Sequence, residues 1–272
     1  MTSAARAAAR SSAPLLAYVL HKYDWSESSL IVELFTRAQG RLVVVAKGAK
    51  RPTSQLRPVL LPFQRLHAQL GKTPADERGE VQLLRQAEWA GGAPLLGPAA
   101  LFPGLYLNEL LLKLLARQDP HPVLFDAYAD TLAALAVAPE GDDAPVLRAF
   151  ELMLLRELGV LPDLSLVTLT LQPLDPAAGH TLRSEQGVVP TAGGGVSGAH
   201  WVQLEAALAH GSPAALRAAC GPVGLGLRGP VRALLQYHLG GTRLRTRDVW
   251  RDVQSLTSAS PQSIDHEPVH RS

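Results

Sequence analysis

The sequence predicts an α+β protein in which a small all-β domain precedes a helical one. Five short β segments follow one another near the start of the chain without a helical period between them, as in a small barrel or sandwich. After residue 91 the apolar residues recur at helical spacing. Charge divides the chain as well. Residues 1–80 carry 12 lysines and arginines against 6 acidic residues, residues 81–227 carry 7 against 14, and residues 228–272 carry 7 against 4.

The five β segments are separated by polar or turn-forming residues. The predicted strands cover residues 15–20, 30–36, 41–46, 62–70 and 80–87. A short glycine-containing turn at residues 38–40 indicates that the second and third strands form a hairpin. A polar loop is expected at residues 21–29 and a basic loop at residues 47–58. The first 13 residues are small, polar and basic, which predicts a disordered tail.

The rest of the chain is predicted to be mainly helical, with one irregular insertion. Helices are expected at residues 101–117, 122–136, 145–158, 199–209, 213–219 and 230–239. Pro145 suits the first turn of a helix and Gly159 suits a helix end. Between the third and fourth helices, residues 160–172 look extended. Residues 173–198 are rich in proline, glycine and small polar residues, so loop or weak strand is expected there.

The first candidate binding surface is the basic stretch 41–57, which contains no acidic residue. Its cations are Arg41, Lys47, Lys50, Arg51 and Arg57. On a small barrel such a loop can follow a phosphate backbone, because each cation that neutralises a phosphate releases counterions. Tyr23 and Trp25, in the preceding loop, are candidates for stacking on bases. The alternatives are an ordinary solvated loop and aromatic rings that pack against the helical domain.

Further basic residues suggest additional contacts. Arg243, Arg245 and Arg247 would share one side of an extended segment and continue a nucleic-acid surface, or would simply solvate the C-terminal region. Arg148 lies beside the apolar face of its helix, where it could bind an acidic or C-terminal peptide tail. The alternatives for Arg148 are a plain surface charge and an ion pair with Glu151 or Glu157. Lys113 and Arg117 are further candidates for binding a protein partner.

Several kinds of site are not supported. The single cysteine, Cys220, rules out an internal disulfide and a multi-cysteine zinc site. Residues 224–229 match G-x-G-x-x-G but follow no predicted strand and precede Pro230, so a dinucleotide site is not expected. The sequence contains no P-loop motif and no G-x-S-x-G motif. No catalytic residue, cofactor or metal is therefore predicted. The apolar runs are too short for a signal peptide or a membrane span, and a cytoplasmic protein is expected.

Specific motifs give the chain a family resemblance. Residues 17–56 contain Trp-Ser-Glu-Ser-Ser at 25–29, Leu-Phe-Thr at 34–36, Gly-Arg at 40–41 and Val-Ala-Lys-Gly-Ala-Lys at 45–50. Further matches lie at residues 104–115, 148–159 and 239–250. On these segments the chain resembles the RecO family of recombination mediators over residues 15–252.

The resemblance implies a five-stranded OB-type β-barrel, then an α-helical domain with a small inserted irregular or β region. The expected divisions are a tail at 1–13, the barrel at 14–90, helices at 91–160, the insertion at 161–198, further helices at 199–256 and a disordered tail at 257–272. The family binds single- and double-stranded DNA, anneals complementary strands and helps to load recombinase during bacterial double-strand-break and gap repair. Its partners are RecR and the acidic C-terminal tail of single-stranded-DNA-binding protein, and it would associate with the nucleoid during repair.

Two other functions stay open at this point, and one motif is missing. The chain could be a protein scaffold whose barrel never touches DNA, or a metal-dependent enzyme that uses the acidic helical middle. Some RecO relatives carry a four-cysteine zinc site in the inserted region, whereas residues 161–198 contain no cysteine. Zinc is therefore not expected, and the insertion needs another source of stability.

Overall fold

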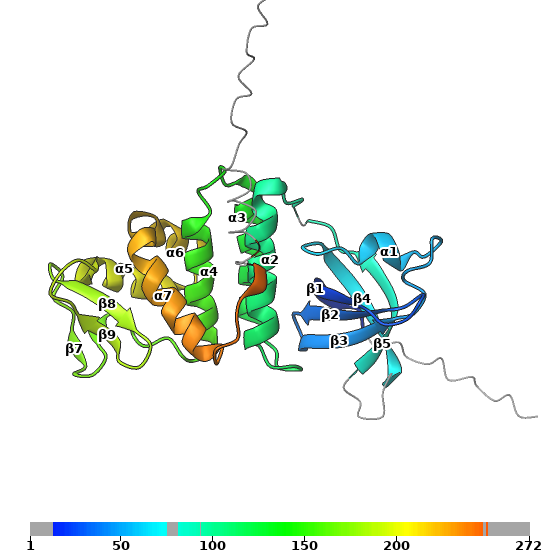
Figure 1. The fold of residues 1–272 in the computed structure, drawn as a ribbon, viewed down its shortest axis with the longest axis horizontal. Coiled ribbons are helices and arrows are strands. Elements are labelled where there is room, and N and C mark those ends of the chain that lie inside the picture. The colour runs from blue at the N-terminus through cyan, green and yellow to red at the C-terminus, as the bar shows by residue number, and fades with distance from the viewer. Residues whose placement is uncertain (1–12, 75–80, 93, 247–248, 250–272) are drawn as a thin grey trace, which may run out of the picture.

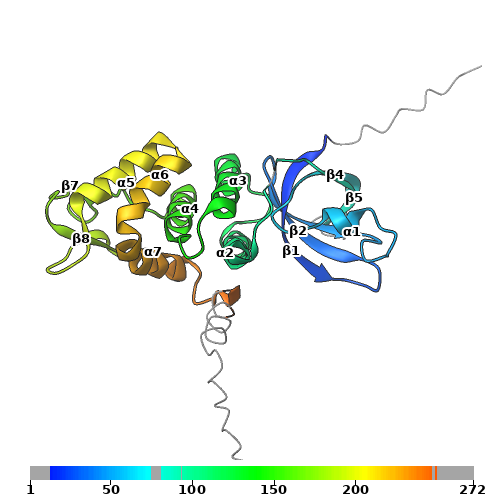
Figure 2. The same ribbon diagram turned by 90° about the horizontal axis from the view of Figure 1, so that it is seen from above.

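The computed structural model describes residues 13–74, 81–92, 94–246 and 249. A β-barrel forms one end of the molecule, a bundle of helices forms the middle, and a small sheet lies at the far end (Figure 1). Viewed at right angles, α2 and α3 stand between the barrel and the remaining helices (Figure 2). No helix in the described part of the chain is long and apolar enough to cross a membrane.

The barrel has the predicted OB-type strand arrangement. Its strands are β1 (Leu15–Asp24), β2 (Leu30–Thr36), β3 (Gly40–Ala46), β4 (Arg65–Pro74) and β5 (Val81–Trp89). They close in the order β1-β2-β3-β5-β4, with β3 and β5 parallel and the other pairs antiparallel. A short helix that the sequence did not predict, α1 (Leu56–Val59), lies between β3 and β4. The predicted barrel and α+β class are confirmed.

Strand β1 is longer than predicted. Residues 21–24 were expected in a loop, but they continue the ladder with β2, and Tyr23 pairs with Ile31. Polar residues occupy this extension because it runs beyond the barrel core, so the apolar pattern stops before the strand does. Tyr23 therefore lies on a strand, and only Trp25 of the two aromatic candidates lies in the β1–β2 loop.

The first two strands are buried on both faces. Ala17, Val19, Val32 and Leu34 point into the barrel core, whereas the alternate residues Tyr18, Leu20 and Phe35 join the core of the helical domain. Because side chains alternate along a strand, one strand can serve two cores only where both faces are covered.

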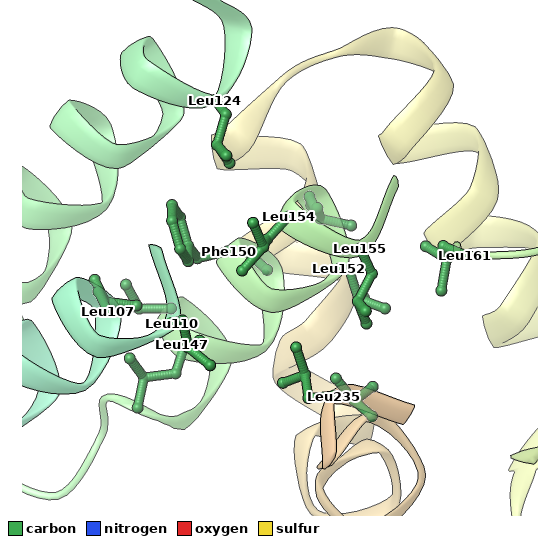
Figure 3. Close-up of a cluster of buried hydrophobic side chains, with 14 of the residues drawn as sticks. Leu107, Leu110, Leu124, Leu147, Phe150, Leu152, Leu154, Leu155, Leu161 and Leu235 are labelled. Atoms are coloured by element: carbon green, nitrogen blue, oxygen red, sulfur yellow. The ribbon is translucent and has the colours of Figure 1, made fainter. Parts of the chain in front are cut away.

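The helical domain contains six α-helices among the described residues. They are α2 (Pro98–Leu114), α3 (Pro122–Val137), α4 (Ala144–Glu157), α5 (Gly198–His210), α6 (Pro213–Cys220) and α7 (Gly224–His238), with a 3₁₀ turn at Gly221–Val223. Helix α4 lies between the other elements, and its Phe150, Leu154 and Leu155 are completely buried (Figure 3).

Helix α7 begins six residues before the predicted start at residue 230, so Pro230 lies inside it. Proline removes the hydrogen bond that the carbonyl of Gly226 would accept. Gly226 is exposed, so water can replace that bond. The glycine-rich motif at 224–229 is thus part of a helix and not a loop around a dinucleotide.

The inserted region is more ordered than the sequence indicated. The predicted extended stretch 160–172 and the weak-strand stretch 173–198 form two small sheets: β6 (Leu166–Val167) pairs with β7 (Gln172–Pro173), and β8 (Gly179–Arg183) lies between β9 (Gly187–Pro190) and β10 (Val196–Ser197). Its glycines permit the tight turns that the composition alone could not place. Gly187 has a φ of 70°, and a Cβ there would lie 2.2 Å from the hydroxyl of Thr168.

Apolar packing holds this region together. Leu164, Leu182, Val188 and Trp201 are at most 2% exposed. Glu205 on α5 accepts hydrogen bonds from the backbone N–H of Leu164 at 2.9 Å and from Arg156 on α4. A structural zinc needs four cysteine or histidine ligands. No group of three side chains that could hold a metal ion exists in the described part of the chain, so these residues do not fit the four-cysteine zinc site that the family resemblance raised.

The barrel and the helical domain share an aromatic interface. The rings of Tyr18 and Phe35 on the barrel meet Phe125 and Tyr128 on α3, with centroids 5.0–6.2 Å apart. Each such pair contributes about 0.5–1.5 kcal/mol beyond the burial of its area. Burial raises the pKa of Tyr128 well above its ordinary value, so its hydroxyl stays neutral and donates to Asn108 Oδ1 at 2.5 Å.

Asn108 on α2 forms a hydrogen bond with a backbone carbonyl that a β-bulge leaves without a strand partner. The register of β1 shifts between Val19 and His21, so Leu20 has no partner residue in the β1–β2 ladder. A bulge leaves backbone groups unpaired, and a buried carbonyl without a hydrogen bond is costly. The side-chain amide of Asn108 donates to the carbonyl of Leu20 at 3.1 Å and joins the barrel to α2.

Gly40 sets how closely the β2–β3 turn approaches the helical domain. Its φ is 67°, and a Cβ on it would lie 1.9 Å from the carbonyl oxygen of Asp119. The neighbouring carbonyl of Arg41 accepts a hydrogen bond of 2.9 Å from the backbone N–H of Gln118. Only glycine fits this contact between two backbones.

We predict that Gly40→Ala destabilises the protein by roughly 3 kcal/mol or more, because left-handed strain adds to a backbone clash. Gly159→Ala is the matched control, since Gly159 has a φ of 70° and no atom within 4 Å of its added Cβ. The control should lose only about 1–2 kcal/mol. Urea unfolding measures both values, and equal losses would contradict the proposed contact.

Candidate nucleic-acid interface

Two loops that carry predicted binding residues meet at one end of the barrel, which we call the barrel rim. The rim consists of residues 25–29, between β1 and β2, and residues 47–64, between β3 and β4. In the strand register Asp24 pairs with Leu30, and Leu30 pairs with Ala46. The loops that follow β1 and β3 therefore leave the barrel side by side.

Lys50 links the two loops of the rim. Its ammonium group lies 3.2 Å from a carboxylate oxygen of Asp24 and donates to the carbonyl of Ser26 at 3.1 Å, while its backbone N–H donates to the carbonyl of Ser28 at 3.0 Å. Lys50 thus contacts the residues on both sides of Trp25. It holds the rim in shape in addition to contributing charge.

The remaining rim candidates face solvent. Lys47, Arg51 and Arg57 are exposed, and Arg57 lies in α1. Trp25 is 64% exposed and Tyr23 is 47% exposed. Tyr23 packs against His21 of its own strand, at a centroid distance of 4.5 Å, and not against the helical domain. The structure therefore brings three solvent-facing cations and an exposed indole to the same rim.

Arg41 differs from the solvent-facing cation that the sequence suggested. Its side chain is 14% exposed and lies 3.3 Å from a carboxylate oxygen of Glu33, whose other oxygen lies 3.2 Å from Arg117. Arg41 is at the opposite end of β3 from Lys47, where the barrel meets the end of α2. One carboxylate thus faces two guanidinium groups here. Arg117, a predicted partner contact, is 45% exposed.

Arg148 forms an ion pair with Glu151, which is one of the alternatives that the sequence left open for it. The two side chains are 2.5 Å apart, and their side chains are 10% and 0% exposed. Tyr106 also donates to the same carboxylate oxygen at 2.6 Å. A peptide tail could reach this guanidinium only if its pairing with Glu151 changed. Cys220 lies nearby, and burial raises the pKa of its thiol to about 12, which makes it unreactive.

Residues 242–246, which we call the C-terminal segment, are fixed to α2. Leu244 is 8% exposed and belongs to the helical core, whereas Arg243 and Arg245 on either side of it are exposed. The predicted alternation thus holds for these two residues, although helical backbone begins at 245. Arg247 lies outside the described residues.

Glu109 and Lys113 form the attachment, which we call the α2 clamp. Glu109 accepts hydrogen bonds from the backbone N–H groups of Arg245 at 2.8 Å and Thr246 at 3.0 Å, and from the hydroxyl of Thr246 at 2.6 Å. Lys113 pairs with Glu109 at 2.7 Å and donates to the carbonyl of Arg243. Lys113 is therefore a structural residue of this segment, and 23% of its side chain is exposed.

Sequence reasoning missed both Glu33 and Glu109, although a signal for each was present. Each glutamate interrupts an apolar run, in Leu-Ile-Val-Glu-Leu-Phe and Leu-Asn-Glu-Leu-Leu-Leu. A carboxylate at a buried position needs cations or N–H donors around it. The pattern could thus have marked both residues as paired, although some of their partners, Arg117 for Glu33 and Arg245 for Glu109, lie 84 and 136 residues away in sequence.

Two family models match the chain, one to each of its domains. The family model for the recombination protein O N-terminal domain matches residues 15–93, and the model for its C-terminal domain matches residues 98–248. The chain is 51% identical over 264 residues to the DNA repair protein RecO of Acidovorax ebreus (strain TPSY), covering 92% of this chain and all of that one.

The chain belongs to the RecO family of DNA repair proteins. It is also 49% identical to the DNA repair proteins RecO of Albidiferax ferrireducens and Variovorax paradoxus, covering 89% and 88% of this chain and 96% of each relative. The names of these RecO proteins state a role in DNA repair and no catalytic activity. The boundary between the two RecO domain models, at residues 93–98, coincides with the connection between barrel and helices.

We predict that the α2 clamp weakens at low pH. Burial alone would raise the pKa of Glu109, but the hydrogen bonds from Lys113, Thr246 and Arg245 outweigh it and lower the pKa below the ordinary value of 4.5. The contribution of Glu109 to stability is therefore complete above that value and is lost as the pH falls through the folded-state pKa.

The measurement compares the free energy of unfolding of the wild type and Glu109→Gln across pH. The wild type should be more stable at neutral pH, and the difference should shrink as the pH falls below about 4.5. A difference that does not change with pH would contradict the assignment.

Proposed function

We propose that this RecO family member binds DNA at the barrel rim and acts there as a recombination mediator. The observation that carries the proposal is the arrangement of Trp25 beside Lys47, Arg51 and Arg57, with Lys50 holding the two loops together. OB barrels bind single strands with a basic surface for the backbone and aromatic rings for the bases. The rim has both features. The outer faces of β1 and β2 are less available, because Tyr18, Leu20 and Phe35 on them pack against the helical domain.

The rim suits strand annealing for an electrostatic reason. Cations that neutralise phosphates reduce the repulsion between two backbones, and contacts limited to phosphates leave the pairing edges of the bases accessible. Single strands would be bound most tightly because their bases can stack on Trp25, whereas a duplex would contact the cations alone. In this role the protein would help to load recombinase onto DNA, and it would do so at the nucleoid in the bacterial cytoplasm.

The proposed protein partners are RecR and the acidic tail of single-stranded-DNA-binding protein. Their support is the family resemblance and the cations of the helical domain. For Arg148 to bind the tail, its ion pair with Glu151 would have to be replaced by an ion pair with a carboxylate of the tail. Arg117, which is half exposed beside the barrel, meets no such burial barrier.

The charge prediction uses the exposed rim cations only. Lys47→Glu, Arg51→Glu and Arg57→Glu together should weaken binding to oligo(dT) and reduce the salt slope by about 2 or more, at about 0.7 for each lost phosphate contact. Lys50 is left intact because its replacement would also disturb the loops. The control is Arg183→Glu with Arg228→Glu, two exposed arginines outside the barrel. Fluorescence anisotropy between low and high salt measures the slope, and an unchanged slope would refute rim binding.

The stacking prediction concerns Trp25. Trp25→Ala should weaken binding to oligo(dT) by about 5- to 100-fold, the effect of losing one stacked base, and should affect duplex DNA much less. Trp25→Phe should restore most of the affinity because it keeps a ring. Tyr237→Ala, at a ring that is 54% exposed on α7, is the control and should have no effect. Equal losses for single-stranded and duplex DNA would contradict stacking.

A further inference from the structure

We infer that Trp89, at the end of β5, is a second ring on which a base of a bound single strand stacks. The inference rests on the proposed function and deepens it, because it states where the strand goes after Trp25. The strand would run from Trp25, past the exposed cations of residues 47–64, to Trp89.

The first observation is that Trp89 lies at the same end of the barrel as the rim. It pairs with Leu66 on β4, and β4 begins at Arg65, directly after the last residue of the rim. Residues that lie opposite each other on antiparallel strands point to the same face of the sheet. Leu66 belongs to the barrel core, so Trp89 ends the inward-facing row of β5, yet it is 59% exposed. The barrel core therefore leaves this indole available to a ligand.

The second observation is that the backbone around Trp89 is fixed. The N–H of the next residue, Ala90, donates to the carbonyl of Arg65 at 2.9 Å. The guanidinium group of Arg65 in turn donates to the carbonyl of Gly91 at 2.9 and 3.1 Å. An exposed ring on a fixed backbone loses little conformational freedom on binding, so its position suits stacking on a base.

The third observation is that the exposed cations of the rim lie along the chain that joins the two rings. Lys47 follows β3, whose end lies beside the loop that carries Trp25. The chain continues past Arg51 to α1, which carries Arg57 and packs against β5, the strand of Trp89. Helix α1 lies at the end of the barrel from which the connection to α2 leaves (Figure 1). Phosphates between two stacked bases would thus meet these cations.

Acidic residues limit where phosphates can bind. Glu27 and Glu88 are exposed and lie close in sequence to Trp25 and Trp89. Glu88 points to the opposite face of β5 from Trp89, because successive strand residues alternate, and it accepts a hydrogen bond from Gln86. Positive charge is therefore concentrated between the two rings and not at them. This distribution favours contact of the rings with neutral bases.

The spacing of the strands indicates that the two rings bind different bases. Strands β1 and β5 are both neighbours of β4, so they lie about 10 Å apart at about 4.8 Å for each step between strands. At 3.4 Å for each nucleotide this separation corresponds to roughly three nucleotides. A strand of about 12 nucleotides, within the range of about 4–16 that one OB-type site covers, would reach both rings.

The experiment measures binding of labelled oligo(dT) of about 12 nucleotides to the full chain by fluorescence anisotropy. Trp89→Ala should weaken binding by about 5- to 100-fold, the effect of losing one stacked base, and should leave the salt slope unchanged because no charge is removed. Trp89→Phe should restore most of the affinity. Tyr237→Ala, at an exposed ring on α7, is again the matched control and should have no effect.

An abasic strand of the same length separates stacking from a change in the shape of the rim. It keeps the phosphates but has no base to stack, so the wild type and Trp89→Ala should bind it equally. An equal loss of affinity for the abasic strand and for oligo(dT) would show that Trp89 supports the fold of the rim, and would overturn the inference. Thermal unfolding of each variant identifies any general loss of fold.

The outcomes separate this inference from the proposed function. Weak binding by Trp25→Ala and by the rim charge variant, with normal binding by Trp89→Ala, would overturn the inference and leave rim binding intact. Normal binding by all three variants would refute rim binding and with it the inference. A loss with Trp89→Ala but none with Trp25→Ala would show that the strand does not run between the two rings, and would overturn the path.

Discussion

The arrangement of the molecule depends on one buried carboxylate, that of Glu33. It lies on the outer face of β2, where it accepts hydrogen bonds from Arg41 on the neighbouring strand and from Arg117, three residues beyond the end of α2. Removing one partner of a buried ion pair typically costs about 3–5 kcal/mol, because a charge is left without compensation. Glu33 therefore makes the orientation of the barrel against α2 specific, whereas the aromatic contacts of Tyr18 and Phe35 supply the attraction but would tolerate some sliding.

The same principle recurs at Glu109, with backbone groups as partners. Its carboxylate satisfies the N–H groups at the start of a helical turn, as a capping residue does, but from a different helix. Two glutamates in apolar runs thus fix two distant segments to α2, the barrel at one end and the C-terminal segment beside it. Helix α2 therefore holds the C-terminal segment directly, and Arg117, in the connection that follows α2, contacts the barrel.

Features that depend on residues close together in sequence were predictable, whereas contacts between residues far apart in sequence were not. The barrel strands and the helices were predictable because alternation and helical spacing are local patterns, and the segments around Trp25 and Lys47 identified the family. The pairing of Arg41 with Glu33 across the predicted hairpin did not follow from the basic character of residues 41–57, and the second contact of Glu33, with Arg117, forms only when the barrel docks. Strand β1 was underestimated because its last residues pair without entering a core. The insertion was hardest, because strands as short as β6 and β10 have two residues each and so carry no alternation of their own that a sequence could show.

The burial of β1 and β2 on both faces has a consequence for how the chain can be divided. A barrel produced without the helices would expose the apolar side chains of Tyr18, Leu20 and Phe35 to water, and Glu33 would lose its contact with Arg117. Such a fragment would self-associate, as exposed apolar patches do. Although two family models divide the sequence near residue 95, the halves are not exchangeable modules, and substitutions on either side of that border are constrained by the other.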